Sequence, residues 1–423
     1  MRKLLCGAIF AGLVGLILQP IPNAVGGGDD NATRFPTFRM QELETGLGVG
    51  YAVVLADVNG DGKPDIVVVD QTRVIWFENP TWKKRIIIQG GTKPDNVCIA
   101  AHDIDGDGQI DFALGADWNP SNTKSGGSIQ WLKRGKTLDD AWTVYPIDSE
   151  PTVHRIRFID IDGNNKPALV SVPLQGRGAT AKGNFVDGAP VRVTAYRIPK
   201  DPAKDRWEPI VLDESLHVCH NFCTADSLVR RATGHDLLVA SYEGVSWLSP
   251  DHGGGKWSRR HIGSGNQETP AGKRGASEIK MGRLKGGYVI ATIEPWHGDQ
   301  VVVYTPPADG NKMWDRHVID EQLRWGHAVS FADLDGDGND ELIVGVRDDP
   351  AKGEKVKDRR GVRIYKALDA KGSKWARHIV DDGGVAVEDL VTGDLNGDGK
   401  IDIVAVGRQT HNVRIYWNEG KKK

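Results

Sequence analysis

The sequence predicts an all-β fold, a seven-bladed β-propeller of four-stranded blades over residues 36–418, with an N-terminal strand closing the last blade. Three observations lead to this prediction. A repeat recurs seven times, its copies contain short strand-like runs bounded by Gly, Asn and Asp, and the two ends of the chain are offset by one strand. The 52 glycines agree with a fold of many tight turns.

Each copy of the repeat is located by the first residue of its turn. The turn D-x-[DN]-G-D-G is complete in four copies, which begin at Asp57, Asp103, Asp333 and Asp394, and a degraded copy, DIDGNNKPA, begins at Asp160. Two copies lack the turn residues and have Asp226 and Arg283 in this place. Successive positions lie 46 to 66 residues apart, which is enough chain for one four-stranded unit.

Four strands are expected in each copy. An apolar run precedes the turn, as at residues 51–56 and 328–332, and a second follows it, as at residues 66–69, 342–346 and 403–406. A third run comes next, at residues 74–77 in the first copy and 413–417 in the last. The fourth strand carries an aromatic residue, one of Phe38, Trp82, Trp142, Trp207, Trp257, Trp314 and Trp375. Val, Ile, Tyr and Trp dominate these runs, as is typical of strands.

The ends of the chain predict a closed ring. Phe38 stands before the first complete copy, whereas the last copy ends after its third strand, at Trp417. Residues 38–43 are therefore expected to pair with the C-terminal strands, which leaves no open sheet edge. A linear array of repeats would need capping units, and the sequence shows none.

The turn has the ligand pattern of a calcium loop. Oxygen ligands at positions 1, 3 and 5 converge, Gly at position 6 permits the bend, and a carboxylate at position 9 completes the set. The four complete copies supply Asp57, Asn59, Asp61 and Asp65; Asp103, Asp105, Asp107 and Asp111; Asp333, Asp335, Asp337 and Glu341; and Asp394, Asn396, Asp398 and Asp402. We expect about four structural Ca²⁺ ions, the alternative being Asp/Asn/Gly turn chemistry without metal. The degraded copy has Asn164 and Ala168 at positions 5 and 9 and is expected to bind weakly or not at all.

These copies resemble the FG-GAP/VCBS repeats of integrin-type propellers and bacterial secreted proteins. The resemblance covers about residues 36–418 and implies the propeller fold and calcium binding. It leaves the function open, because such propellers serve as adhesion modules, lectin-like domains and enzymes.

The first 24 residues have the pattern of a signal peptide. Arg2 and Lys3 precede an apolar segment at residues 4–18, and prolines interrupt the chain before Ala24. We expect an exported protein, periplasmic or extracellular, with a flexible leader at residues 25–35, a basic tail at residues 419–423 and no membrane span after cleavage. A retained anchor is the alternative.

Charge and cysteine content narrow the class further. A formal net charge of −3 indicates neither nucleic acid nor a membrane surface as partner. Cys219 and Cys223 lie four residues apart on one predicted strand, about 13 Å, which is too far for a disulfide. We expect these thiols and that of Cys98 to be free and mostly buried.

The start of each innermost strand contributes one residue to a common end of the central channel. Six residues before the turn, three copies have histidine and one has glutamate, namely His154, His220, His327 and Glu388, with Glu278 one residue out of register. His217 is expected in the loop just before. Imidazole and carboxylate groups around a funnel suit Zn²⁺ or another divalent transition metal. The alternative is a polar channel mouth filled with water.

Loops between the second and third strands should emerge at the same end. They supply Trp118, Gln175, Arg177, Tyr242, Trp296, His297, Arg347 and Arg408. Trp and Arg suit a carbohydrate, by stacking and by hydrogen bonds to hydroxyl groups or an oxyanion. The loop at residues 173–190 is the longest and is a candidate lid. His261, His317 and His378 follow the aromatic residue on outer strands and are interpreted as structural.

Segments at residues 172–190, 217–223, 294–300 and 324–327 resemble the propeller part of aldos-2-ulose dehydratase-type proteins. The resemblance implies a carbohydrate lyase that eliminates water from keto-sugars, although the chain has no room for the cupin domains that accompany this propeller. A metal or Arg177 would stabilise an enediolate, and His154 or His220 would remove the proton, with His297 a further catalytic candidate. The alternative function is a non-catalytic module that binds glycans or proteins.

Overall fold

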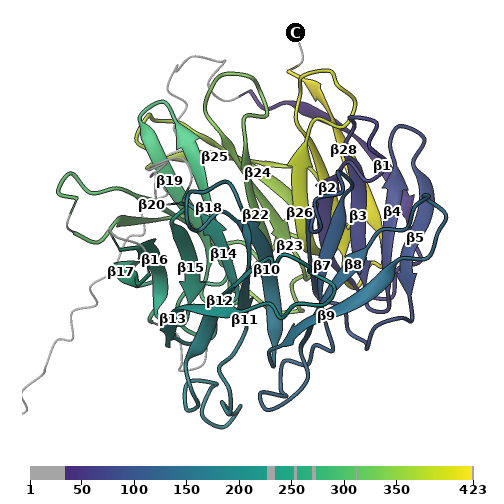
Figure 1. Ribbon diagram of the computed structural model, residues 1–423. Coiled ribbons are helices and arrows are strands. Elements are labelled where there is room, and N and C mark those ends of the chain that lie inside the picture. Colours follow the sequence, from purple (N-terminus) through teal and green to yellow (C-terminus); the bar gives the residue numbers. More distant parts are fainter. Residues whose placement is uncertain (1–33, 226–233, 252–254, 269–272, 311, 422–423) are drawn as a thin grey trace, which may run out of the picture. The chain divides into compact units, whose positions relative to one another are not determined.

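The computed structural model describes residues 34–225, 234–251, 255–268, 273–310 and 312–421. Within these ranges every regular element is a strand, and the 28 strands form seven four-stranded antiparallel sheets (Figure 1). The prediction of an all-β propeller with seven blades is confirmed. No helix within the described ranges is long and apolar enough to cross a membrane.

Six blades use four consecutive strands. The first three are β2 (Gly50–Ala56), β3 (Asp65–Asp70), β4 (Arg73–Glu78) and β5 (Lys83–Gln89); β6 (Cys98–His102), β7 (Asp111–Ala116), β8 (Ser128–Lys133) and β9 (Thr143–Ser149); and β10 (Val153–Ile159), β11 (Ala168–Pro173), β12 (Val191–Arg197) and β13 (Pro209–Leu216). The next three are β14 (Asn221–Thr224), β15 (Leu237–Ser241), β16 (Gly244–Pro250) and β17 (Trp257–Gly263); β18 (Ile279–Leu284), β19 (Gly287–Glu294), β20 (Gln300–Thr305) and β21 (Asp315–Asp320); and β22 (Gly326–Ala332), β23 (Glu341–Val346), β24 (Gly361–Ala367) and β25 (Trp375–Ile379).

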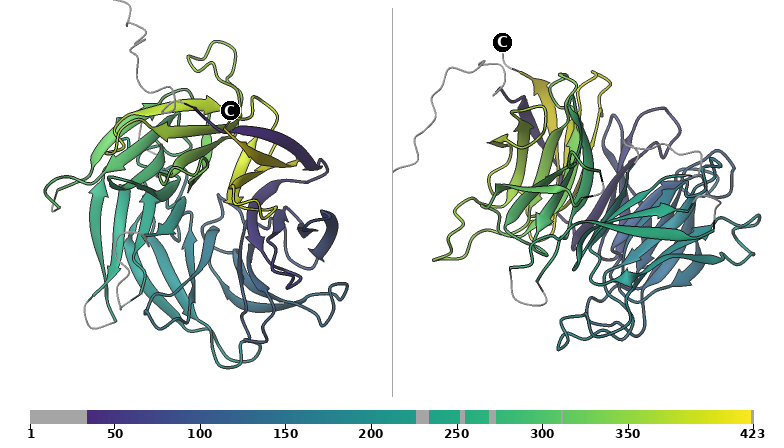
Figure 2. Two further views of the ribbon diagram at one scale, coloured as in Figure 1. Left: turned by 90° about the horizontal axis from the view of Figure 1, so that it is seen from above. Right: turned by 90° about the vertical axis from the view of Figure 1, so that its left-hand side faces the viewer.

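The seventh blade joins the two ends of the propeller. Its order is β1 (Thr37–Glu44), β28 (Val413–Gly420), β27 (Asp402–Gly407) and β26 (Val387–Gly393). Strand β1 runs antiparallel to β28 and places Met40 opposite Tyr416. In Figure 2 the purple β1 lies beside the yellow C-terminal strands. The predicted closure by an N-terminal strand is confirmed.

The first strands of the blades, β2, β6, β10, β14, β18, β22 and β26, contact one another in sequence around the axis (Figure 2). The second strands are the most buried: every residue of β3, β23 and β27 is buried between neighbouring blades. The predicted aromatic residues lie at or just before the fourth strands, and Trp82 contacts Trp417 with ring centroids 5.9 Å apart. The hydrophobic contacts between blades therefore continue across the closing blade.

Some expectations lie outside the described residues or need correction. The signal peptide, nearly all of the leader, Asp226 and the last two residues of the tail are outside the described ranges. Phe35 was expected in the flexible leader, but its ring stacks on His378 at 5.2 Å. The three described cysteines are buried and free as expected, but Cys219 precedes β14 and does not share a strand with Cys223.

The predicted calcium turns connect the first and second strands, at the end of the propeller opposite the strand starts. In the first turn, both carboxylate oxygens of Asp57 accept backbone N–H groups, from Gly60, Asp61 and Gly62. Gly62 has a φ of 84°, which explains why glycine occupies position 6. The Asp65 carboxylate at position 9 is buried and accepts N–H groups from Val58 and Asn79.

Candidate functional site

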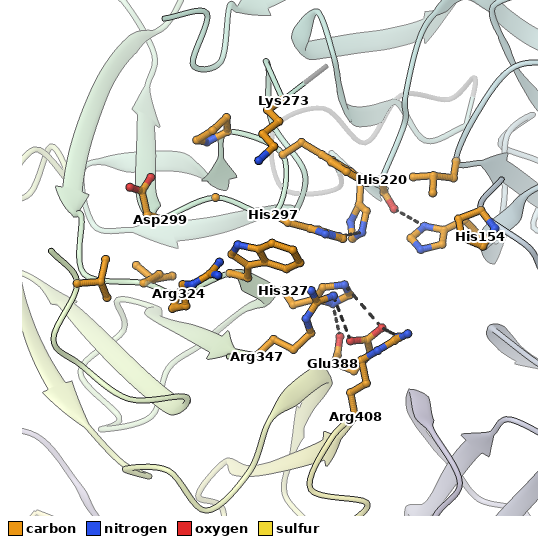
Figure 3. A pocket seen from close by; sticks show the side chains of 18 of the residues that line it. His154, His220, Lys273, His297, Asp299, Arg324, His327, Arg347, Glu388 and Arg408 are labelled. Atoms are coloured by element: carbon orange, nitrogen blue, oxygen red, sulfur yellow. Dashed lines mark hydrogen bonds and ion pairs between the residues drawn. The ribbon is translucent and has the colours of Figure 1, made fainter. Parts of the chain in front are cut away.

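The starts of the innermost strands bring distant histidines together at one end of the axis (Figure 3). His154, His327 and Glu388 are the second residues of β10, β22 and β26, whereas His220 immediately precedes β14. All four side chains are buried. Because the seven blades present the same strand end to the axis, residues more than 200 positions apart become neighbours.

These residues form the floor of a pocket of about 630 Å³. Three tryptophans, Trp118, Trp296 and Trp325, line its walls. The loop between β23 and β24 supplies Glu354 and Lys355 to the lining, whereas the longer loop at residues 174–190 supplies Leu174 alone. The arrangement offers flat apolar surfaces above a polar floor, as is typical of pockets for small ligands.

Three imidazoles converge on the pocket floor. The ligand nitrogens of His220, His297 and His327 lie within 4.8 Å of one another, and Nε2 of His297 is 2.7 Å from Nε2 of His220. Trp296 stacks on His297 with ring centroids 4.3 Å apart and nearly parallel planes. His297 comes from the loop after β19, where its φ of 49° turns the backbone sharply.

The environment of each ring sets which nitrogen carries the proton. Nδ1 of His327 donates to the carbonyl oxygen of Glu388 at 2.6 Å, and Nδ1 of His154 donates to the carbonyl oxygen of His220 at 2.9 Å. Nδ1 of His220 lies 2.7 Å from Oε1 of Glu278, a charge contact that favours a proton on this nitrogen although the pair is not aligned as a hydrogen bond. Nε2 is therefore the unprotonated nitrogen in all three rings. Nε2 of His154 accepts a 3.3 Å contact from Nη1 of Arg155, and Nε2 of His220 faces Nε2 of His297.

Burial keeps the imidazoles neutral. It lowers the pKa of His154, His220, His297 and His327 well below the usual value near 6.5, and the nearby Arg155 guanidinium lowers all four further. Neutral imidazole is the form that binds metal ions and removes protons.

Glu388 is held by arginines rather than by the histidine group. Its Oε1 accepts a hydrogen bond from Nη1 of Arg408 at 2.7 Å, and its Oε2 lies 3.8 Å from Nη1 of Arg347. Burial raises the pKa of Glu388, and these two guanidinium groups oppose the rise. Oε1 is also 3.7 Å from Nε2 of His327, so the carboxylate borders the imidazole cluster.

The structure brings nine of the predicted site residues into the pocket lining: Trp118, His154, His220, Trp296, His297, His327, Arg347, Glu388 and Arg408. Five others lie elsewhere. Glu278 lies behind His220, and Gln175 is buried beside Thr152. Nδ1 of His217 lies 2.8 Å from Oε1 of Glu243, and Tyr242 lies in the turn between β15 and β16. The assignment of Arg177 to an oxyanion in the pocket is corrected, because Arg177 forms a bidentate ion pair with Glu150 outside the lining.

Several lining residues were missed by the sequence analysis. Arg324 and Trp325 directly precede β22, and Glu354 and Lys355 lie in a loop without strand-like pattern. Arg324 and Trp325 stand three and two residues before His327, so the positions just before a pocket histidine were a usable signal. No spacing rule would have selected the residues of the long loop.

The three converging imidazoles fit a divalent transition metal better than the set expected from the sequence. The fit rests on three neutral nitrogen donors, two of them with Nδ1 held by a hydrogen bond or charge contact. His297 takes the place expected for His154, whose Nε2 instead accepts a 3.3 Å contact from Arg155. The Glu388 carboxylate, which was also expected among the metal ligands, instead accepts a hydrogen bond from Arg408.

Two family models match the chain. The model described as "Aldos-2-ulose dehydratase, beta-propeller domain" matches residues 126–307, and the FG-GAP-like repeat matches residues 57–114. Among curated proteins, aldos-2-ulose dehydratase of Phanerodontia chrysosporium is 27% identical over 301 residues, covering 66% of this chain and 32% of that protein. Residues 57–114 thus resemble an FG-GAP-like repeat, and the propeller resembles that of aldos-2-ulose dehydratase over residues 126–307.

A second curated relative also bears the name of an enzyme that acts on a carbohydrate. Rhamnogalacturonan exolyase YesX of Bacillus subtilis (strain 168) is 24% identical over 368 residues, covering 76% of this chain and 52% of that protein. The chain thus spans about a third of the length of aldos-2-ulose dehydratase and about half of the length of the exolyase.

Solved structures show the fold alone. A chain of the mitotic checkpoint complex matches with a TM-score of 0.54 and 9% identity, covering 96% of this propeller and 98% of that chain. A chain of the BBS1N complex with ARL6DN, soaked with lead, matches with a TM-score of 0.51 and 13% identity, covering 92% of this chain and 97% of that chain.

Proposed function

We propose that the pocket binds a carbohydrate and that the protein is a lyase, eliminating water or another leaving group from a sugar that carries a carbonyl group. The observation that supports this most is the cluster of neutral imidazoles beside two guanidinium groups on the floor of a tryptophan-lined pocket. Both curated relatives bear the names of carbohydrate-processing enzymes, which agrees with a sugar as ligand.

His154 is the candidate base. Its Nδ1 is fixed on the His220 carbonyl, so Nε2 carries the lone pair, and burial lowers its pKa so that the ring stays neutral. To act as a base, Nε2 exchanges its 3.3 Å contact with Arg155 for the substrate proton. The base removes the proton next to the carbonyl group, and negative charge then develops on the carbonyl oxygen. Arg347 and Arg408, which line the pocket, would stabilise this charge.

A divalent metal such as Zn²⁺, held by His220, His297 and His327, would supply a Lewis acid near the developing negative charge. The tryptophans would hold the sugar ring and exclude water. We further propose Ca²⁺ in the turns opposite the pocket, and export to the periplasm or outside the cell directed by residues 1–24.

The metal is tested by elemental analysis of purified protein after dialysis against a calcium buffer. We expect one equivalent of a transition metal, and loss of both this metal and keto-sugar turnover in His327→Asn. The matched control is His261→Asn on the outer strand β17, which should keep both. Unchanged turnover in His327→Asn would contradict the proposal.

The second candidate is a glycan-binding module without chemistry, and the three tryptophans of the pocket wall, of which Trp325 is exposed, favour it. It predicts that sugars bind and are recovered unchanged in NMR spectra. Turnover that depends on His154 excludes it, and binding without turnover supports it.

A further inference from the structure

The pocket lining is cationic although the chain is not. Lysine and arginine supply five lining residues and aspartate and glutamate three, an excess of two positive charges, whereas the whole chain has a formal net charge of −3. Local reversal of charge around a concave site attracts an anionic ligand. A neutral sugar would not need this excess.

One of these cations is buried and poorly satisfied. Arg347 is 7% exposed, yet its carboxylate contacts are long: 3.5 Å to Asp348 and 3.8 Å to Glu388. Its Nε has no hydrogen-bond partner, and Arg408 takes the short contact with Glu388. A buried guanidinium with unused donors is costly unless a ligand completes its hydrogen bonds.

A tryptophan fixes the position of this guanidinium. The guanidinium carbons of Arg324 and Arg347 lie 4.9 and 4.7 Å from the centroid of the Trp325 ring. Trp325 adopts a φ of 58°, rare for a bulky residue, and its ring remains 36% exposed. It is 6.0 Å from His297, so a ring stacked on Trp325 would reach both the imidazole floor and Arg347.

We propose that Arg347, held against Trp325, binds the carboxylate of an acidic sugar, so that the substrate class is a uronic-acid-containing carbohydrate. This inference rests on the proposed carbohydrate lyase function and specifies its substrate. A planar guanidinium pairs with a carboxylate through two parallel hydrogen bonds, which also fixes the orientation of the sugar.

The carboxylate takes the role of the carbonyl group in the elimination. The base takes the proton from the carbon bonded to the carboxylate, and the electron pair of this C–H bond forms a carbon–carbon double bond. The C–O bond at the next carbon breaks, and the leaving oxygen takes a proton from solvent. Atoms and electrons balance without an oxidant, and Arg347 stabilises the doubly charged intermediate.

Binding is measured by calorimetry on the full chain, with a galacturonate oligosaccharide, the same oligosaccharide after carboxyl reduction, and a sulfated neutral sugar. We expect at least tenfold tighter binding of the acidic oligosaccharide, and loss of this preference in Arg347→Gln. Arg347→Lys, which keeps the charge but not the two parallel bonds, should retain part of it. Arg359→Gln in the same loop, outside the lining, is the control.

Each other outcome overturns a defined part of the proposal. Equal binding of acidic and reduced oligosaccharides refutes the carboxylate site but leaves carbohydrate binding intact. A preference for the sulfated sugar, or a preference retained in a folded Arg347→Gln, refutes the assignment to Arg347 and a carboxylate. Absence of binding to all three sugars refutes the acidic-sugar substrate class, and absence of binding to a keto-sugar as well refutes the proposed function itself.

Discussion

Individual side chains behind the pocket decide how its imidazoles can act. Glu278 does not line the pocket, yet its carboxylate faces Nδ1 of His220 and also lies 3.8 Å from Arg155. Burial raises the pKa of Glu278, and Arg155 and Asn221 counteract this. Its place behind His220 makes it a positioning residue, not the substrate-binding residue expected from the sequence.

Glu278→Gln removes the charge that favours a proton on Nδ1 of His220. We expect the affinity for Zn²⁺ to fall about tenfold to hundredfold, as is usual when a partner of a metal-binding histidine is lost. The measurement is a competition titration of metal-free protein with a chelating indicator. Glu243→Gln is the matched control, because Glu243 forms the same kind of pair with His217 outside the lining. Equal loss in both variants would refute a specific role.

At the scale of the element, the four complete turns differ in their cationic neighbours. In the sixth blade, Lys366 contacts Asp335, Asp337 and Glu341, and Lys421 also contacts Asp335. In the second blade, Lys133 contacts Asp105. In the seventh blade, Lys400 contacts Asp398 at 2.7 Å. An ammonium group among the same oxygens competes with Ca²⁺, so the turn at Asp57, whose described carboxylates pair with no lysine, should bind it most readily.

Removing calcium with a chelator should lower the melting temperature, and added calcium should restore it. A site that binds only the folded state stabilises it by about 2.7 kcal/mol when calcium is 100-fold above its Kd. Asp57→Asn together with Asp394→Asn should reduce bound calcium by two ions. Asp160→Asn in the degraded turn should leave the count unchanged. A melting temperature indifferent to calcium would show that these turns need no metal.

For the molecule as a whole, closure of the ring places the pocket. The seven strand starts meet at one end, where β26 of the last blade contacts β2 of the first, and β1 completes the seventh blade beside β28. Without β1, the backbone groups of β28 would form an open edge, and Trp417 would lose Gln41, which accepts its Nε1 hydrogen bond at 2.9 Å.

Deletion of residues 37–44 should therefore destabilise every blade together. We expect the free energy of unfolding to fall by about 5 kcal/mol, which lowers the melting temperature by roughly 6 °C, with concentration-dependent aggregation through the new edge. Calorimetry and size-exclusion chromatography measure both effects. Arg39→Ala, an exposed substitution on the same strand, is the control and should change neither. Normal melting of the deleted protein would argue against closure as a source of stability.

The sequence by itself determined the blade number, the four-strand unit and the closing strand, because repeat spacing and strand periodicity are local properties. It also selected His154, His220, His327 and Glu388, since each stands at a fixed distance from its turn. Only the tertiary structure decided that His297 joins the imidazole cluster, that Arg177 turns to Glu150, and that Trp325 holds Arg347. Loop paths and ion-pair choices depend on neighbouring blades, and no spacing within one repeat encodes them.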